Sequence, residues 1–158
     1  MSTYFSILYS FFKPNLDELE SKLENLNLPE LENFDKFFFI LPDEVKEAKE
    51  MIQIKWMELF GRELGFSAQN TSAFYHGATV IKTDELFLNF SDLKPDQSLL
   101  GKNVWQTNSP PSDPAEAMAL LYYTLGKIQQ KHNGLLNKFE MSIKEYKNMV
   151  FKYFHTKQ

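Results

Sequence analysis

The run Phe37-Phe38-Phe39-Ile40-Leu41 constrains the fold more than any other segment of the chain. A short apolar run bounded by turn signals is typical of a β-strand that is covered on both faces. Pro29 lies upstream of this run and Pro42 follows it directly. The run therefore predicts a fully buried strand.

Three further segments have the pattern of strands. Tyr4–Phe12 alternates, with Phe5, Ile7, Tyr9 and Phe11 on one face and serines on the other, and period two with β-favouring residues predicts a strand. Two short strands are expected at Ala78–Lys82 and Leu86–Phe90, with Thr83–Glu85 as a tight hairpin between them. These segments and the buried run predict a small sheet of about four strands.

Two helices are expected in the first half of the chain. The first follows Pro14, with Asn15 as its cap and leucines at helical spacing (Leu16, Leu19, Leu23 and Leu26). The second begins at Pro42, since proline suits the first helical position, and ends at Gly61 or Gly65.

Two further helices close the chain, and their starts are the best-specified features of the sequence. Asp113-Pro114-Ala115-Glu116 combines a cap, a proline at the first position and a glutamate placed to complete a capping box. That helix is expected to end at Asn133-Gly134. Ser142-Ile143-Lys144-Glu145 is a second capping box.

The remaining segments are expected to be loops. Phe66–Gly77 is rich in Ser, Asn and Thr, and Asp92–Asp113 is interrupted by Pro95, Pro110 and Pro111. The whole chain then has the order β-α-β-α-β-β-α-α, with about four helices packed on one face of the sheet. Because 158 residues suit one domain, we expect a single α+β domain spanning residues 1–158.

Charge is distributed unevenly along the chain. The net charge of −4 divides into −6 over residues 1–65, −1 over 66–134 and +3 over 135–158. An acidic first half disfavours nucleic-acid binding there, because contact with phosphate drives such binding. We therefore expect another protein as the partner, most simply a basic one.

Composition and motifs narrow the chemistry further. The chain contains no cysteine, which excludes disulfides and thiolate metal sites and favours a cytoplasmic location. Its three histidines lack metal-ligand spacing, and no glycine-rich phosphate loop or nucleophile motif occurs. The N-terminal apolar run lacks signal-peptide features and is shorter than the ~20 residues of a membrane span. We expect no cofactor, no metal and no membrane span.

The segment Phe74-Tyr75-His76-Gly77 is the most site-like local cluster, because it places a histidine beside a flexible glycine and two aromatic residues. As a catalytic site it would use His76 as general base, oriented by a carboxylate such as Asp84, under a roof formed by the loop 92–113. The alternative is an ordinary loop that Phe74 packs down, and we favour this alternative.

Acidic residues offer a second candidate site. They are frequent on both early helices, with lysines interleaved, so a solvated helix face is the default interpretation. An acidic docking surface for a basic partner is the functional alternative, and such a surface would steer association. The candidate partner-binding residues are Asp17, Glu20, Glu24, Glu44, Glu47, Phe74, Tyr75, His76 and Trp105.

Three functions remain open at this point. The favoured hypothesis is a non-catalytic protein-binding module, such as an inhibitor or an immunity-type protein that sequesters a partner. This class of protein is small, acidic and free of catalytic motifs, as this chain is. The alternatives are a structural subunit that self-assembles through its aromatic residues and an enzyme that uses His76.

Overall fold

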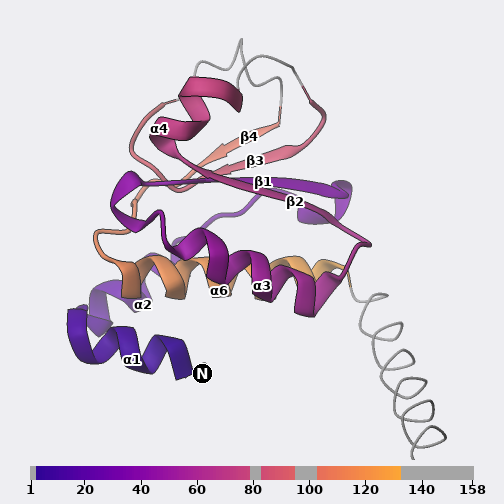
Figure 1. The fold of residues 1–158 in the computed structure, drawn as a ribbon. Helices are drawn as coiled ribbons and strands as arrows, with labels where there is room; N and C mark the ends of the chain where they lie inside the picture. Colours follow the sequence, from indigo (N-terminus) through magenta and orange to yellow (C-terminus); the bar gives the residue numbers. More distant parts are fainter. Residues whose placement is uncertain (1–2, 79–82, 95–102, 133–158) are drawn as a thin grey trace, which may run out of the picture.

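A parallel sheet lies at the centre of the fold (Figure 1). The computed structural model describes residues 3–78, 83–94 and 103–132, without the side chains of residues 3–6 and 78. Over these residues the sheet has four strands in the order β2-β1-β3-β4, all parallel to their neighbours. The strands are β1 (Lys36–Leu41), β2 (Gly65–Asn70), β3 (Leu86–Asn89) and β4 (Val104–Gln106).

Helices cover both faces of this sheet. The long helices α3 (Ala48–Phe60) and α6 (Pro114–Lys131) lie beneath it in Figure 1, whereas α4 (Thr71–Ala73) and the π-helical turn η3 (Phe74–Ala78) lie above it. The expected small sheet of about four strands with packed helices is therefore confirmed for the described residues. The helices differ from the expectation in covering two faces, and the element order differs in detail.

The strand β1 explains why both faces need a cover. Its odd-numbered side chains face α3 and α6, where Phe37 and Phe39 pack against Trp56 with ring centroids 5.4 and 6.0 Å apart. Its even-numbered side chains, Phe38 and Ile40, join a smaller cluster on the opposite face. The predicted buried strand is thus confirmed.

The first ten described residues differ from their prediction. Thr3–Phe12 forms a helix, α1, that packs near α6, and the expected strand over Tyr4–Phe12 is wrong. Most residues of this segment are apolar, so they satisfy helical spacing as well as alternation. The hydroxyl of Ser10 donates to the carbonyl of Ile7 at 2.7 Å, a bond made within one helical turn.

The segment predicted as a loop at Phe66–Gly77 is also structured. It contributes β2, whose residues pair with β1 from Lys36↔Gly65 to Leu41↔Asn70, and then α4 and η3. Phe66 and Ala68 face the main core while Ser67 and Gln69 alternate with them. Hydrogen bonds of the sheet outweigh the low β-propensity of this polar segment.

Both helices expected in the first half are present, but the first ends at Glu24, before Leu26, and the second begins later than expected. Helix α2 spans Leu16–Glu24, and the side chain of Asn15 accepts from the amides of Asp17 and Glu18, as expected. The second helix does not begin at Pro42, because a separate 3-10 turn, η2 (Asp43–Val45), precedes α3. A second 3-10 turn, η1, spans Leu31–Asn33.

The expected start of α6 is confirmed. The carboxylate of Asp113 accepts from the amides of Ala115 and Glu116 at 2.8 and 2.9 Å. The stretch 92–113, expected to be irregular, contains β4. The strand expected at Leu86–Phe90 is confirmed as β3, but the expected hairpin is wrong, because β3 pairs in parallel with β1 on one side and with β4 on the other. Ala78 belongs to η3, and the rest of the expected strand at 79–82, the Asn133-Gly134 stop and the helix from Ser142 lie outside the described residues.

Candidate functional site

Large apolar side chains are exposed on α1 and at the first residue of α2. Phe11 is the most exposed of them, with 78% of its surface accessible, and Ile7 lies one turn before it. Leu8 is half-buried and marks the inward side of the helix. We call the exposed set the N-terminal patch, and it consists of Ile7, Tyr9, Phe11, Phe12 and Leu16.

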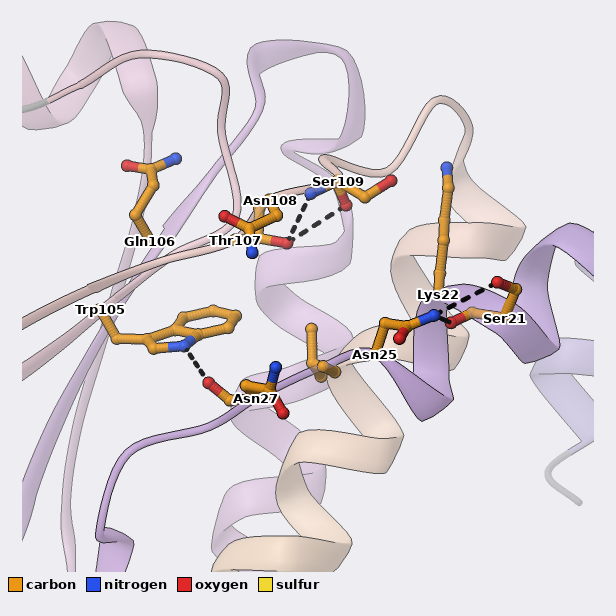
Figure 2. A pocket seen from close by; sticks show the side chains of 10 residues that line it. Ser21, Lys22, Asn25, Asn27, Trp105, Gln106, Thr107, Asn108 and Ser109 are labelled. Atoms are coloured by element: carbon orange, nitrogen blue, oxygen red, sulfur yellow. Dashed lines mark hydrogen bonds between the residues drawn. The ribbon is translucent and has the colours of Figure 1, made fainter.

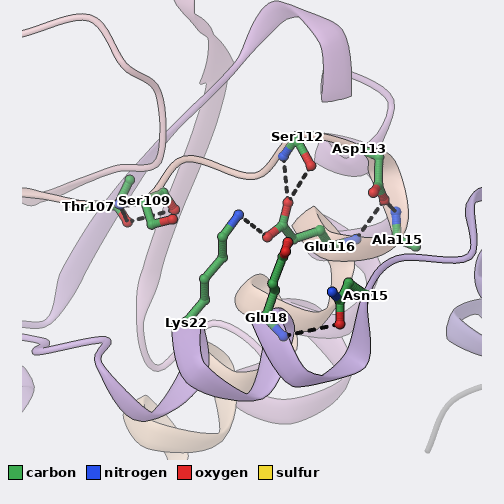
Figure 3. A network of polar contacts seen from close by, with 9 residues as sticks. All are labelled: Asn15, Glu18, Lys22, Thr107, Ser109, Ser112, Asp113, Ala115 and Glu116. Atoms are coloured by element: carbon green, nitrogen blue, oxygen red, sulfur yellow. Dashed lines mark hydrogen bonds and ion pairs between the residues drawn. The ribbon is translucent and has the colours of Figure 1, made fainter.

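The outer face of α2 adjoins this patch and is acidic. It exposes the carboxylates of Asp17, Glu20 and Glu24, whereas Glu18 is exposed on the side of the helix that carries Lys22 (Figure 3). Lys22 supplies the only basic side chain of this helix, and it turns inward. The outer face of α2 therefore carries charge of one sign, beside an apolar surface.

Lys22 is directed to a carboxylate at the start of α6 (Figure 3). Its Nζ forms an ion pair with Oε1 of Glu116, a residue that is only 4% exposed. The other carboxylate oxygen, Oε2, accepts from the amide and hydroxyl of Ser112 at 2.6 and 2.7 Å. The expected capping box is thus shifted by one residue, since Glu116 bonds Ser112 rather than Asp113.

The pKa of Glu116 follows from these contacts. Burial raises it and is the largest single effect, yet the Lys22 ammonium and the two Ser112 donors together outweigh burial and hold the pKa below its ordinary value. Glu116 therefore carries its charge at neutral pH. That charge compensates Lys22, so the lysine does not offset the carboxylates on the outer face of α2.

A polar hollow lies between α2 and the carboxyl end of β4 (Figure 2). Its volume is about 260 Å³. Trp105 forms one wall, and its Nε1 donates to the backbone carbonyl of Asn27 at 2.6 Å. Its ring lies 5.4 Å from that of Phe90. The hollow is lined by Ser21, Lys22, Asn25, Leu26, Asn27, Trp105, Gln106, Thr107, Asn108 and Ser109.

The predicted acidic residues lie in two places. Asp17, Glu20 and Glu24 are exposed together on α2, close in sequence to the N-terminal patch. Glu44 and Glu47 are exposed at η2 and at the start of α3. Of the predicted residues, Trp105 alone lines the hollow, and it does so across from α2.

The predicted aromatic cluster divides between core and surface. Phe74 is fully buried, with its ring 5.4 Å from that of Phe38. Tyr75 is exposed at the edge of the Phe74 ring, and partial burial raises the pKa of its hydroxyl. His76 is exposed, and no hydrogen bond between described residues joins it to Asp84. The packing of Phe74 agrees with the interpretation of this segment as one that Phe74 packs down.

Asp43 has a position that sequence reasoning did not anticipate. It follows β1 and caps α4, because its carboxylate accepts from the amide of Ser72 at 3.1 Å and from the side chains of Ser72 and Asn70. The Ser72 hydroxyl, followed by the Asn70 amide, lowers the pKa of Asp43. Within the described residues, the Asp43 carboxylate thus bonds only to residues at the end of β2 and the start of α4, and it has a structural role at the carboxyl ends of β1 and β2.

These features define a layered protein with a parallel sheet, an exposed apolar and acidic surface at its first two helices, and one polar hollow beside Trp105. No protein-family model matches the chain, and no curated protein is similar enough to be a relative. In the described part of the chain, no helix is both long and apolar enough to cross a membrane. The same residues contain no group of three His, Asp or Glu side chains arranged to hold a metal ion.

Proposed function

We propose that this chain is a non-catalytic protein-binding module that docks a basic partner protein on the N-terminal patch and the outer face of α2. The exposure of Phe11 and its apolar neighbours is the observation that carries the proposal. Exposed apolar surface with a polar rim is characteristic of protein interaction sites. A module of this kind would act by occupying the partner's surface, as inhibitors and immunity-type proteins do.

The charge beside the patch favours a basic partner over a second copy of the chain. In a two-fold dimer the same surface serves both subunits, so a dimer centred on the patch would bring the acidic faces of two α2 helices near each other. A basic surface would instead meet Glu20 and Glu24 with opposite charge and accelerate association.

Partner capture from native extract tests this proposal when it is combined with two matched double variants. Glu20→Lys/Glu24→Lys reverses two exposed charges on α2, and Glu44→Lys/Glu47→Lys reverses two exposed charges at η2 and α3. Both variants change the net charge equally. We expect the α2 variant alone to reduce capture of a partner that persists after nuclease treatment, by about tenfold.

Phe11→Ser supplies the apolar arm of the experiment, because this side chain is largely exposed and its loss leaves the core intact. Phe11→Ser is expected to reduce capture of the partner protein as the α2 double variant does. Capture that depends only on Glu44 and Glu47 would overturn the assignment of the docking surface. A chain that forms dimers by light scattering, and loses them with Phe11→Ser, would establish self-assembly in place of the proposed partner.

A further inference from the structure

The hollow beside Trp105 has a lining that is largely uncharged and hydrogen-bonding. Apart from Lys22, Leu26 and Trp105, its residues carry amide or hydroxyl side chains. An amide group donates and accepts, and a hydroxyl group does both through one atom. Such a lining matches a ligand whose own groups both donate and accept hydrogen bonds.

The charge of the hollow disfavours an anionic ligand. Lys22 contributes the only ionic side chain of the lining, and its ammonium is paired with the buried carboxylate of Glu116. A phosphate would have to compete with that carboxylate for the same ammonium. The pair leaves the hollow nearly neutral, which suits a neutral ligand.

The wall formed by Trp105 is held in one orientation. Its indole N–H is bonded to the carbonyl of Asn27, and Phe90 packs against the ring from the core side. The face of an aromatic ring carries negative charge density and attracts the positive edges of C–H groups. A fixed indole therefore offers a surface for a ring that carries C–H groups on one side.

The strand that carries Trp105 is also fixed. The side chain of the next residue, Gln106, points away from Trp105 (Figure 2), where it accepts from the Nδ2 of Asn89 at 2.6 Å and donates to the backbone carbonyl of Ser91. By contrast, the side-chain amides of Asn27 and Asn108 form no hydrogen bond to another described residue. Donors and acceptors are thus available at the rim of a preorganised site, which lowers the entropy lost when a ligand binds.

We infer that this hollow binds a sugar ring, seated with its C–H face on Trp105 and its hydroxyls toward Asn27 and Asn108. A volume of about 260 Å³ suits a small ligand. The site lies at the carboxyl end of β4, the edge at which parallel α/β sheets usually place their ligands. It uses none of the residues of the N-terminal patch, so it stands independently of the proposed protein binding.

The two tryptophans of the chain allow a direct test by NMR. Trp56 is buried and donates to the carbonyl of Leu64, whereas Trp105 lines the hollow. In the 15N-labelled full chain, Trp105→Phe assigns the two indole N–H signals. Titration with glucose, galactose, mannose and N-acetylglucosamine is expected to shift the Trp105 signal saturably, with a Kd of about 1 mM or tighter for at least one sugar.

Variants at the rim distinguish binding in the hollow from weak contact elsewhere. Asn27→Ala and Asn108→Ala alter exposed side chains and are each expected to weaken binding about fivefold, the effect of one lost hydrogen bond. Gln53→Ala on the exposed side of α3 is the control and should leave the affinity unchanged. The inference is overturned if no sugar moves the Trp105 signal at about 20 mM, if both rim variants bind as the parent does, or if inorganic phosphate or adenosine saturates the site in place of the sugars.

Discussion

Lys22 of α2 and Glu116 of α6 form an ion pair at the point where the second helix crosses the start of the last described one (Figure 3). The pair has two consequences. It ties α2 to the helix that supports the sheet, because Glu116 is itself held by Ser112 in the turn before α6. It also removes the one basic side chain of α2 from the outer face, which leaves that face acidic.

Replacement of Lys22 by methionine is expected to destabilise the protein by about 2 kcal/mol. The substitution leaves a buried carboxylate without its counter-ion, a change that costs about 3–5 kcal/mol when burial is complete. Here Lys22 is 24% exposed and Ser112 still donates two bonds to Glu116, so the loss should be smaller. Urea unfolding at neutral pH measures the difference.

Lys131→Met is the matched control for this prediction. Its ammonium lies 3.0 Å from a carboxylate oxygen of Glu32, and both side chains are largely exposed. Exposed pairs contribute little to stability because solvent screens them, so Lys131→Met should reduce the free energy of unfolding less than Lys22→Met does. Equal losses from the two substitutions would show that the Lys22–Glu116 pair has no greater role than a surface contact.

Glu116 is expected to contribute to the loss of stability that the protein undergoes in acid. Because the folded pKa of Glu116 is lowered, the folded state binds its proton less readily than the unfolded chain does. This contribution to stability is complete above the ordinary pKa of 4.5 and is lost as the pH falls through the lower folded value. Urea unfolding between about pH 6 and 3 should therefore show that the free energy of unfolding falls less steeply with pH in Glu116→Gln than in the parent. The same dependence on pH in both proteins would contradict the lowered pKa of Glu116.

The sequence predicted those elements whose signals are local. Asn15 and Asp113 cap α2 and α6 as expected, since a cap depends on a side chain and the two or three amides that follow it. The strand β1 was also predictable, because an uninterrupted apolar run needs cover on both faces. Its neighbours in the sheet were harder to infer, since pairing between distant strands leaves little trace in either sequence.

The wrong assignments of secondary structure to two segments in the first half of the chain have separate physical causes. At Thr3–Phe12 most positions are apolar and the two serines are four residues apart, so period two and helical spacing both describe the segment. At Gly65–Asn70 the alternation of Phe66 and Ala68 with polar residues was present, but loop-forming residues surround it. Parallel pairing with β1 decides the second case, and a single sequence does not display that pairing.

The candidate sites were predictable only in part. The exposure of the α2 carboxylates follows from helical spacing, because Leu19 and Leu23 of the same helix occupy the opposite face. The hollow joins residues of α2 to residues that follow Trp105, which lie far along the chain. No short motif connects those segments, so only the folded arrangement brings them together.

Two phenylalanine substitutions should separate the core from the proposed docking surface. Phe39 is fully buried between the sheet and α3, so Phe39→Ala is expected to cost about 4 kcal/mol through lost burial and a cavity. Phe11 is 78% exposed, so Phe11→Ala should change the free energy of unfolding by no more than about 0.5 kcal/mol. Urea unfolding of both variants provides the comparison. A large loss from Phe11→Ala would show that this side chain belongs to the core and would remove it from the docking surface.

The end of α1 offers a stabilising substitution. Lys13 has a φ of 47°, a left-handed conformation, and its amide donates to the carbonyl of Tyr9 at 2.9 Å as the helix ends. This conformation costs a non-glycine residue about 1–2 kcal/mol, whereas glycine adopts it freely and loses about 0.5–1 kcal/mol more entropy on folding. Lys13→Gly is therefore expected to stabilise the protein by about 0.5 kcal/mol.

Amide hydrogen exchange at Phe11 and Phe12 is the most direct measurement of this effect, because it reports on opening of α1 as well as on global unfolding. Exchange should slow in Lys13→Gly. Ser10→Gly, placed within the helix at a residue whose hydroxyl bonds the carbonyl of Ile7, is the control and should speed exchange, with a loss of about 0.5–1 kcal/mol. If both substitutions speed exchange, the left-handed residue at position 13 imposes no cost, and the helix end is instead maintained by contacts that the lysine side chain provides.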